Sequence, residues 1–252
     1  MMKLHPDLNT DPQTMQLYNK GIAGQWQPAT VIDWNAPSGL DGIEARALGR
    51  LITPVYLGEQ VAMSGVATVL PQYLQEGEAP EELYLSTMGL DEARHFEALN
   101  RLYRTMKVDP IPMHRFPEMF QFHHRLLEVQ DKSEWLYGIL ICDILAKQFY
   151  GWIAKSLDGH PAGDLAAHIL VDEGRHQAFS VHTLGKAIEK KGDELTPRML
   201  AMRDDLLDMM KKMYVRMKDD VETLGIDPDA FFGTIEDDLE RKNKRIGIVK
   251  AA

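Results

Sequence analysis

The sequence of 252 residues contains a single cysteine, Cys142. An intramolecular disulfide is therefore impossible, which is typical of proteins from a reducing compartment. No apolar run approaches the roughly 20 residues that a helix needs to cross a bilayer, and the first ten residues lack the apolar stretch of a secretory signal. We therefore expect a cytoplasmic protein without membrane contact.

Basic residues are scarce as well. The chain has 28 Lys and Arg against 38 Asp and Glu, which gives a formal net charge of −10. Phosphate binding needs clustered basic side chains, and the one basic run, from Arg241 to Arg245, is short. Nucleic acid is therefore not expected as a partner, and a small molecule or a protein is.

Strand signals are weak throughout, so helical periodicity decides the fold class, which we expect to be all-α. Four prolines among residues 1–38 predict an extended N-terminal arm with at most short helical turns. A short helical run is expected near Leu127. Apolar spacing predicts longer helices over about 40–52, 55–74, 79–106, 133–157, 163–191, 196–224 and after Pro228.

A five-residue pattern occurs twice, as Asp91-Glu92-Ala93-Arg94-His95 and as Asp172-Glu173-Gly174-Arg175-His176. On a helix, a Glu and a His three residues apart project from one face, so each copy offers one carboxylate and one imidazole to a common point. Two further carboxylates stand in apolar stretches. Glu59 precedes Glu92 by 33 residues and Asp143 precedes Glu173 by 30, each about one helix plus a turn.

An unpaired ionised carboxylate in a core costs several kcal/mol, so these two acids require a cation. Helices in the order Glu, Glu-x-x-His, carboxylate, Glu-x-x-His are typical of a four-helix bundle that binds two metal ions. The oxygen-rich donor set favours iron or manganese. A solvated helix face with internal charge pairs is the alternative, and it suits one copy of the motif better than two. The predicted ligands are Glu59, Glu92, His95, Asp143, Glu173 and His176.

The two motifs resemble those of the ferritin-like dimetal-carboxylate superfamily, especially bacterial di-iron monooxygenase hydroxylases, acyl-CoA epoxidases and proteins like the ribonucleotide reductase small subunit. The resemblance runs from about Tyr56 to His182. The segment QWQPATVIDW is also similar to the N-terminal part of reductase-small-subunit-like ligand-binding oxidases. The resemblance implies a ferritin-like bundle with two iron ions, or Mn/Fe, that reduces O2.

The resemblance also implies roles for the other motif residues. Asp91 and Asp172 are expected to orient the metal-bound histidines, with Arg94 and Arg175 neutralising the two aspartates. Plain iron-storage ferritins do not need this arrangement, so it favours redox catalysis. Leu99 stands where the reductase subunit carries its radical tyrosine, so a reductase-subunit role is not expected.

Lys147 follows Asp143 by one helical turn, so we expect it near the metal ions or the adjoining cavity. There it is predicted to be catalytic, anchoring a substrate carboxylate or tuning the oxygen chemistry. The alternative is a packed lysine stem whose amine pairs with Asp143.

These observations predict an O2-activating dimetal oxygenase or oxidase for a small organic substrate, with a reductase or ferredoxin as electron donor. Trp26 and Trp34 are candidates for the electron route. We expect a homodimer of a single domain, with the arm at 1–38, metal-binding helices at 40–191 and additional helices at 195–252. Two alternatives stay open: an iron-storage or detoxification protein without organic substrate, and a scaffold in which metal only holds the fold together.

Overall fold

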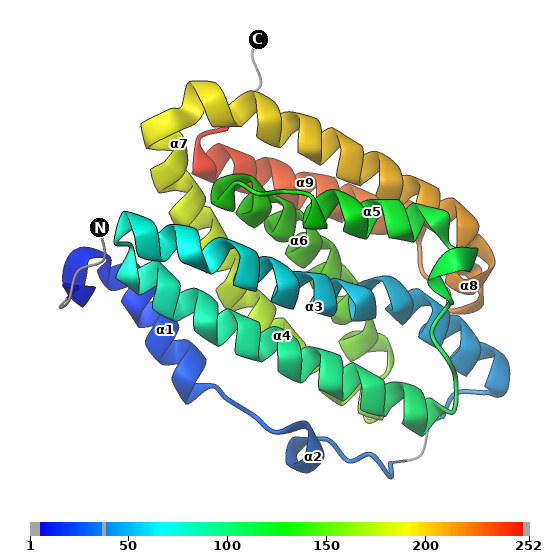
Figure 1. Ribbon diagram of the computed structural model, residues 1–252. Coiled ribbons are helices and arrows are strands. Elements are labelled where there is room, and N and C mark those ends of the chain that lie inside the picture. The colour runs from blue at the N-terminus through cyan, green and yellow to red at the C-terminus, as the bar shows by residue number, and fades with distance from the viewer. Residues whose placement is uncertain (1–5, 37–38, 249–252) are drawn as a thin grey trace.

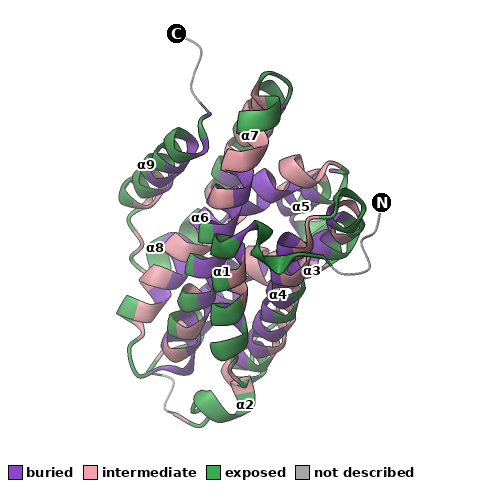
Figure 2. Cartoon of the chain, turned by 90° about the vertical axis from the view of Figure 1, so that its left-hand side faces the viewer, coloured by how far each residue is buried: buried purple, intermediate pink, exposed green. Residues whose placement is uncertain are grey.

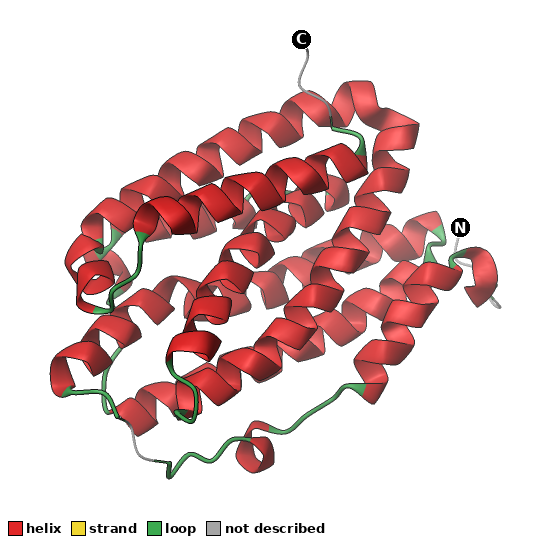
Figure 3. Ribbon diagram, turned by 180° about the vertical axis from the view of Figure 1, so that it is seen from behind, coloured by secondary structure: helices red, strands yellow, loops and turns green. Residues whose placement is uncertain are grey.

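The computed structural model describes residues 6–36 and 39–248, and these residues form helices and loops without a strand (Figure 3). The all-α prediction is therefore confirmed. No helix in the described ranges is both long and apolar enough to cross a bilayer. The helices are α1 (Pro12–Ala23), α2 (Pro28–Val31), α3 (Gly42–Glu76), α4 (Ala79–Met106), α5 (Pro117–Leu127), α6 (Lys132–Ser156), α7 (Pro161–Arg216), α8 (Lys218–Thr223) and α9 (Pro228–Ile246), with short 3-10 turns at η1 (Leu8–Thr10) and η2 (Met113–Arg115).

Four long helices form the bundle that positions the site. Helix α3 packs along α4, and α6 packs along α7, whose second half bends over the top of the bundle in Figure 1. The helix faces that meet inside the bundle are buried, whereas the outward faces are exposed (Figure 2). Buried apolar residues from all four helices belong to one connected cluster.

Side-chain caps fix where several helices begin. Asp41 accepts hydrogen bonds from the backbone N–H groups of Ile43 and Glu44, and the Glu44 carboxylate accepts one from the N–H of Asp41. This capping box satisfies donors that a helix start leaves free. Asp131 and Asp227 cap α6 and α9 through two backbone N–H groups each.

Two helix boundaries predicted from proline are wrong. Helix α3 continues through Pro54, and α7 continues through Pro197. Tertiary packing holds the helix across Pro54, where Nε2 of His123 on α5 lies 3.0 Å from the Pro54 carbonyl oxygen. Tertiary contacts thus outweigh local propensity. In α7 a kink at Lys191, with φ −140° and ψ 29°, lies next to the predicted break.

The predicted extended arm also needs correction, because α1 occupies twelve of its residues. Asp11 accepts a hydrogen bond from the N–H of Thr14, and Pro12 stands at the first helical turn, a combination that favours a helix start. Helix α1 packs against α4 (Figure 1). Residues 24–36 contain no helix apart from the single turn of α2. Residues 1–5 and 37–38 of the predicted arm lie outside the described residues.

Candidate metal centre

The six predicted ligands come together in the middle of the bundle, one or two from each long helix. Their donor atoms form two groups, and the atoms within each group lie within 4.8 Å of one another. Both groups are buried and share Glu173. The first group is Glu59, Glu92, His95 and Glu173, and the second is Asp143, Glu173 and His176.

Two glutamates lie between the imidazoles. Oε2 of Glu92 is 3.7 Å from Nδ1 of His95, and Oε1 of the same carboxylate is 3.4 Å from Nδ1 of His176. Glu173 also lies between the two rings: its Oε1 is 4.0 Å from Nδ1 of His95, and its Oε2 is 3.9 Å from Nδ1 of His176. Glu59 lies 3.4 Å from Nδ1 of His95 only. This arrangement would suit two neighbouring metal ions, with the six residues as ligands.

Several atoms of the predicted ligands are buried and have no hydrogen-bond partner among the described residues. They are Nδ1 of His95, Nδ1 of His176, Oδ2 of Asp143 and Oε2 of Glu173. A buried polar atom without a partner costs about 1–3 kcal/mol. Metal ions can accept the lone pairs of all four atoms. The residues are therefore suited to binding two metal ions.

The second ring nitrogen of each histidine contacts an aspartate from the other motif. Nε2 of His95 lies 3.1 Å from Asp172, and Nε2 of His176 lies 3.2 Å from Asp91. An N–H donated to a carboxylate fixes the tautomer, which leaves Nδ1 free to bind a metal.

The two motif arginines join these aspartates. Nη2 of Arg94 donates to Asp91 at 2.6 Å and to Asp172 at 2.8 Å. Nη2 of Arg175 donates to both as well, at 2.9 Å for Asp172. All four side chains are buried, so the arginines balance the charge of two buried carboxylates.

Burial controls protonation among the predicted ligands. Burial, reinforced by neighbouring carboxylates, raises the pKa of Glu92, Asp143 and Glu173 above its ordinary value. Burial lowers the pKa of His95, but Asp172 and Glu59 outweigh it and raise that pKa well above its usual range. Without metal the cluster thus retains protons, and a metal ion has to displace them.

The supporting aspartates behave in the opposite way. Burial raises the pKa of Asp91, but His176 and Arg175 outweigh burial and bring it to about 2. The pKa of Asp172 is also lowered, because His95, Trp26 and Arg94 outweigh the effect of burial. Both aspartates are therefore ionised near neutral pH.

Comparison with protein-family models found no match for this sequence, and comparison with curated proteins found none either. Solved structures do match. One is a tyrosine-to-phenylalanine variant of an R2-like ligand-binding oxidase with an aerobically reconstituted Mn/Fe cofactor, with a TM-score of 0.80, 17% identity and 95% of each chain covered. A glycine-to-phenylalanine variant with the same cofactor has a TM-score of 0.75, 18% identity and coverage of 95% of this chain and 98% of that one. The chain has the ferritin-like fold of the R2-like ligand-binding oxidases.

Within this R2-like fold, the N-terminal segment supplies two contacts to the aspartates. Nε1 of Trp26 donates to Asp172 at 2.8 Å, and Nε2 of Gln25 donates to Asp91 at 3.0 Å. Trp34, the other tryptophan considered for electron transfer, instead donates to the carbonyl of Pro28. Sequence reasoning missed Gln25. Its position beside Trp26 in the QWQPATVIDW segment was the available signal.

Lys147 lies outside the cluster, contrary to the expected orientation. Its amine is 3.6 Å from Asp238 on α9, and its side chain is 43% exposed. Tyr150, one turn further along α6, does reach the site and donates a hydrogen bond to Glu59 at 3.0 Å. The contact with α9 therefore places the Lys147 amine away from the position that helical spacing alone suggested.

The remaining buried or half-buried histidines join neither group of donor atoms in the described ranges. His123 contacts two backbone carbonyls, those of Met119 and Pro54. His182 pairs with Asp11, and His168 packs against the ring of Trp26 at 5.1 Å. Their contacts are structural.

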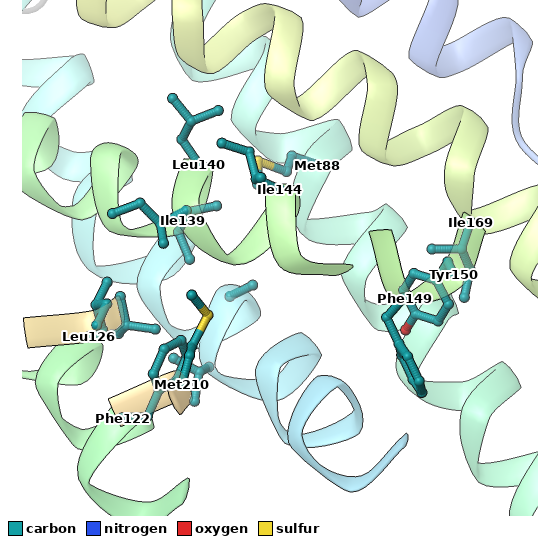
Figure 4. Packing of buried hydrophobic residues seen from close by; sticks show 14 of the residues in the cluster. Met88, Phe122, Leu126, Ile139, Leu140, Ile144, Phe149, Tyr150, Ile169 and Met210 are labelled. Carbon is teal, nitrogen blue, oxygen red and sulfur yellow. The ribbon is translucent and has the colours of Figure 1, made fainter. Parts of the chain in front are cut away.

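A cavity of about 50 Å³ borders the carboxylates, and it is lined by Glu59, Glu92, Asp143 and Glu173 on one side. One water needs about 10–15 Å³, so the cavity holds more than one. Most of the other lining residues are apolar. Figure 4 shows three of them, Phe122, Leu126 and Ile139, among the packed side chains of the core.

A second cavity of about 90 Å³ adjoins the first. The described residues that line it, from α3, α6, α7, α9 and the α8 region, include no charged side chain. The two cavities share Pro54, Val55, Leu145 and Met213 in their walls. The two cavities and the wall that they share form a candidate apolar route from the C-terminal helices toward the carboxylates.

Proposed function

We propose that the protein is an O2-activating dimetal oxidase or oxygenase that acts on a small organic substrate. The observation that carries this proposal is the pair of buried imidazoles whose Nδ1 atoms face shared carboxylates while their Nε2 atoms contact ionised aspartates. This arrangement prepares all donor atoms for two cations in a site from which bulk water is excluded.

In this proposal the six predicted ligands hold two iron ions or one manganese and one iron. The choice of metals is supported by the oxygen-rich donor set and by the Mn/Fe cofactors of structurally similar oxidases. When bound, the metal ions supply the electrons that reduce O2. Tyr150 holds Glu59 in place through its hydroxyl group, and the apolar residues that line the same cavity as the carboxylates receive the organic substrate.

Electrons for repeated turnover require a donor, and we propose a reductase or ferredoxin. Trp26 is the candidate for their route, because its indole bonds Asp172, which in turn contacts His95. The indole is half-buried, so it lies between the surface and the site. Assembly as a homodimer stays a prediction.

The test is to load the metal-free protein anaerobically with Fe(II), alone and with Mn(II), and then to admit O2. We expect two metal ions per chain and a transient absorption band that decays faster when a substrate is present. Iron that accumulates as mineral far beyond two ions per chain would instead establish storage. Two bound ions that never react with O2 would establish a structural metal site.

A further inference from the structure

The two repeated motifs form a nearly symmetric pair, but the N-terminal segment contacts them unequally. Each arginine donates to both aspartates, so every aspartate oxygen receives one arginine N–H. Gln25 and Trp26 then add one donor to each aspartate, on oxygens that differ in their relation to the histidines.

On Asp172 the added donor falls on the oxygen that serves the histidine. Oδ2 of Asp172 receives Nε1 of Trp26 at 2.8 Å and Nη2 of Arg94 at 2.8 Å, and it also contacts Nε2 of His95 at 3.1 Å. A carboxylate oxygen has two lone pairs, so three donors compete for them. Asp172 is therefore the weaker hydrogen-bond acceptor for its histidine.

On Asp91 the added donor falls on the opposite oxygen. Nε2 of Gln25 bonds Oδ1 at 3.0 Å, while Oδ2 is left to Arg175 and His176. Gln25 is an exposed residue, but its amide makes two further hydrogen bonds: Nε2 also donates to the carbonyl of Gly21 at 2.8 Å, and Oε1 accepts from Arg94 at 2.5 Å. Gln25 thus fixes the Asp91 carboxylate with Oδ2 aimed at His176.

We propose that Gln25 is a positioning residue for the metal ion bound by His176, and that the N-terminal segment makes the two metal positions inequivalent. The inference rests on the two-metal site of the proposed function. Hydrogen bonding to the outer side of a histidine ligand typically changes metal affinity 10–100-fold, about the size of effect expected here.

The experiment measures Mn(II) binding to the metal-free protein by electron paramagnetic resonance. Two parent variants isolate the positions: Glu59→Gln leaves the His176 position, and Asp143→Asn leaves the His95 position. In the first parent, Gln25→Leu should weaken Mn(II) binding about tenfold or more. In the second parent, the same change should leave affinity within about threefold, which a general loss of structure would not do.

Gln25→Glu separates the hydrogen bond that Gln25 accepts from the two that it donates. A glutamate still accepts from Arg94 but no longer donates to Asp91 or to the Gly21 carbonyl, so it should weaken the His176 position at least as much as Gln25→Leu. Trp26→Phe is the matched control, and it should change affinity only at the His95 position. Equal weakening of both positions by Gln25→Leu, or wild-type affinity with Gln25→Glu, would overturn the proposal. Failure of the wild-type protein to bind Mn(II) would count against the proposed function itself.

Discussion

The Asp91 carboxylate lies 3.2 Å from Nε2 of His176, a residue of the other motif. In the same way, the Asp172 carboxylate lies 3.1 Å from Nε2 of His95. Each motif therefore supports the histidine of its partner motif, across the interface between α4 and α7. Neither imidazole is oriented until these two helices are docked, so the metal site depends on the assembled bundle and not on either helix alone.

This crossing predicts which aspartate controls which metal position. In an Asp143→Asn protein, where only the His95 position remains, Asp172→Asn should weaken Mn(II) binding about 10–100-fold because the amide is a poorer acceptor for the imidazole N–H. Asp91→Asn in the same protein should change affinity less than about threefold. Titration followed by electron paramagnetic resonance gives both numbers. A larger effect from Asp91→Asn would show that each aspartate acts within its own motif.

The clustering of the six candidate ligands was predictable from sequence because helical spacing fixes which residues share a face. Glu92 with His95 and Glu173 with His176 needed only three-residue spacing, and Glu59 and Asp143 stood out as carboxylates in apolar stretches. The crossed pairing was not predictable. It depends on the relative register of α4 and α7, which side chains from several helices set together.

Lys147 illustrates the same limit. Helical spacing places it one turn from Asp143, but spacing does not reveal that α9 covers this part of α6 and presents Asp238 to the amine. The N-terminal segment is a related case. Its prolines indicated an extended arm, yet Pro12 stands at a helix start where it costs nothing, and the chain after α1 brings Gln25 and Trp26 to the aspartates.

The apolar route predicts that Met213→Trp hinders access to the metal centre, since Met213 lines both cavities. Turnover of an organic substrate should show a KM raised about tenfold, which corresponds to about 1.4 kcal/mol, with metal content unchanged. Xenon binds apolar cavities, so crystals of the Met213→Trp variant under xenon pressure should show lower xenon occupancy where the two cavities adjoin. Met209→Trp on the same helix, at a partly buried position outside both cavity walls, is the control. Unchanged KM and xenon occupancy in Met213→Trp would contradict the route.

The raised pKa values predict opposite pH responses for the metal-free and metal-loaded proteins. The pKa of Glu92, Asp143 and Glu173 lies above the ordinary 4.5 or 3.8, so their contribution to stability is complete below those values. It is lost as pH rises through the raised values, because the folded state then has to bury unpaired charge. The metal-free protein should therefore lose stability as pH rises above about 4.5.

With metal bound, the same carboxylates are ligands and release their protons, so metal affinity should increase over that range and offset the loss. Urea unfolding at a series of pH values, with and without Mn(II), measures both trends. The lowered pKa of Glu59 does not interfere, because its contribution to stability is already complete above 4.5. A metal-free protein whose stability rises between pH 5 and 8 would be inconsistent with protons held by the cluster.

Close packing of α3 against α6 predicts that Gly65→Ala destabilises the protein. A Cβ at Gly65 would lie 1.9 Å from Nε1 of Trp135, whose ring is buried. Forcing a methyl group into such a core costs about 1–3 kcal/mol or more. Because α3 carries Glu59 and α6 carries Asp143, the two helices should separate and metal affinity should fall with stability. Gly151→Ala on α6 is the matched control: its Cβ meets no atom within 4 Å, and alanine stabilises a helix by about 0.5–1 kcal/mol relative to glycine. Urea unfolding of the two variants should shift the midpoint in opposite directions, and a loss of stability in both would contradict this account of the α3–α6 contact.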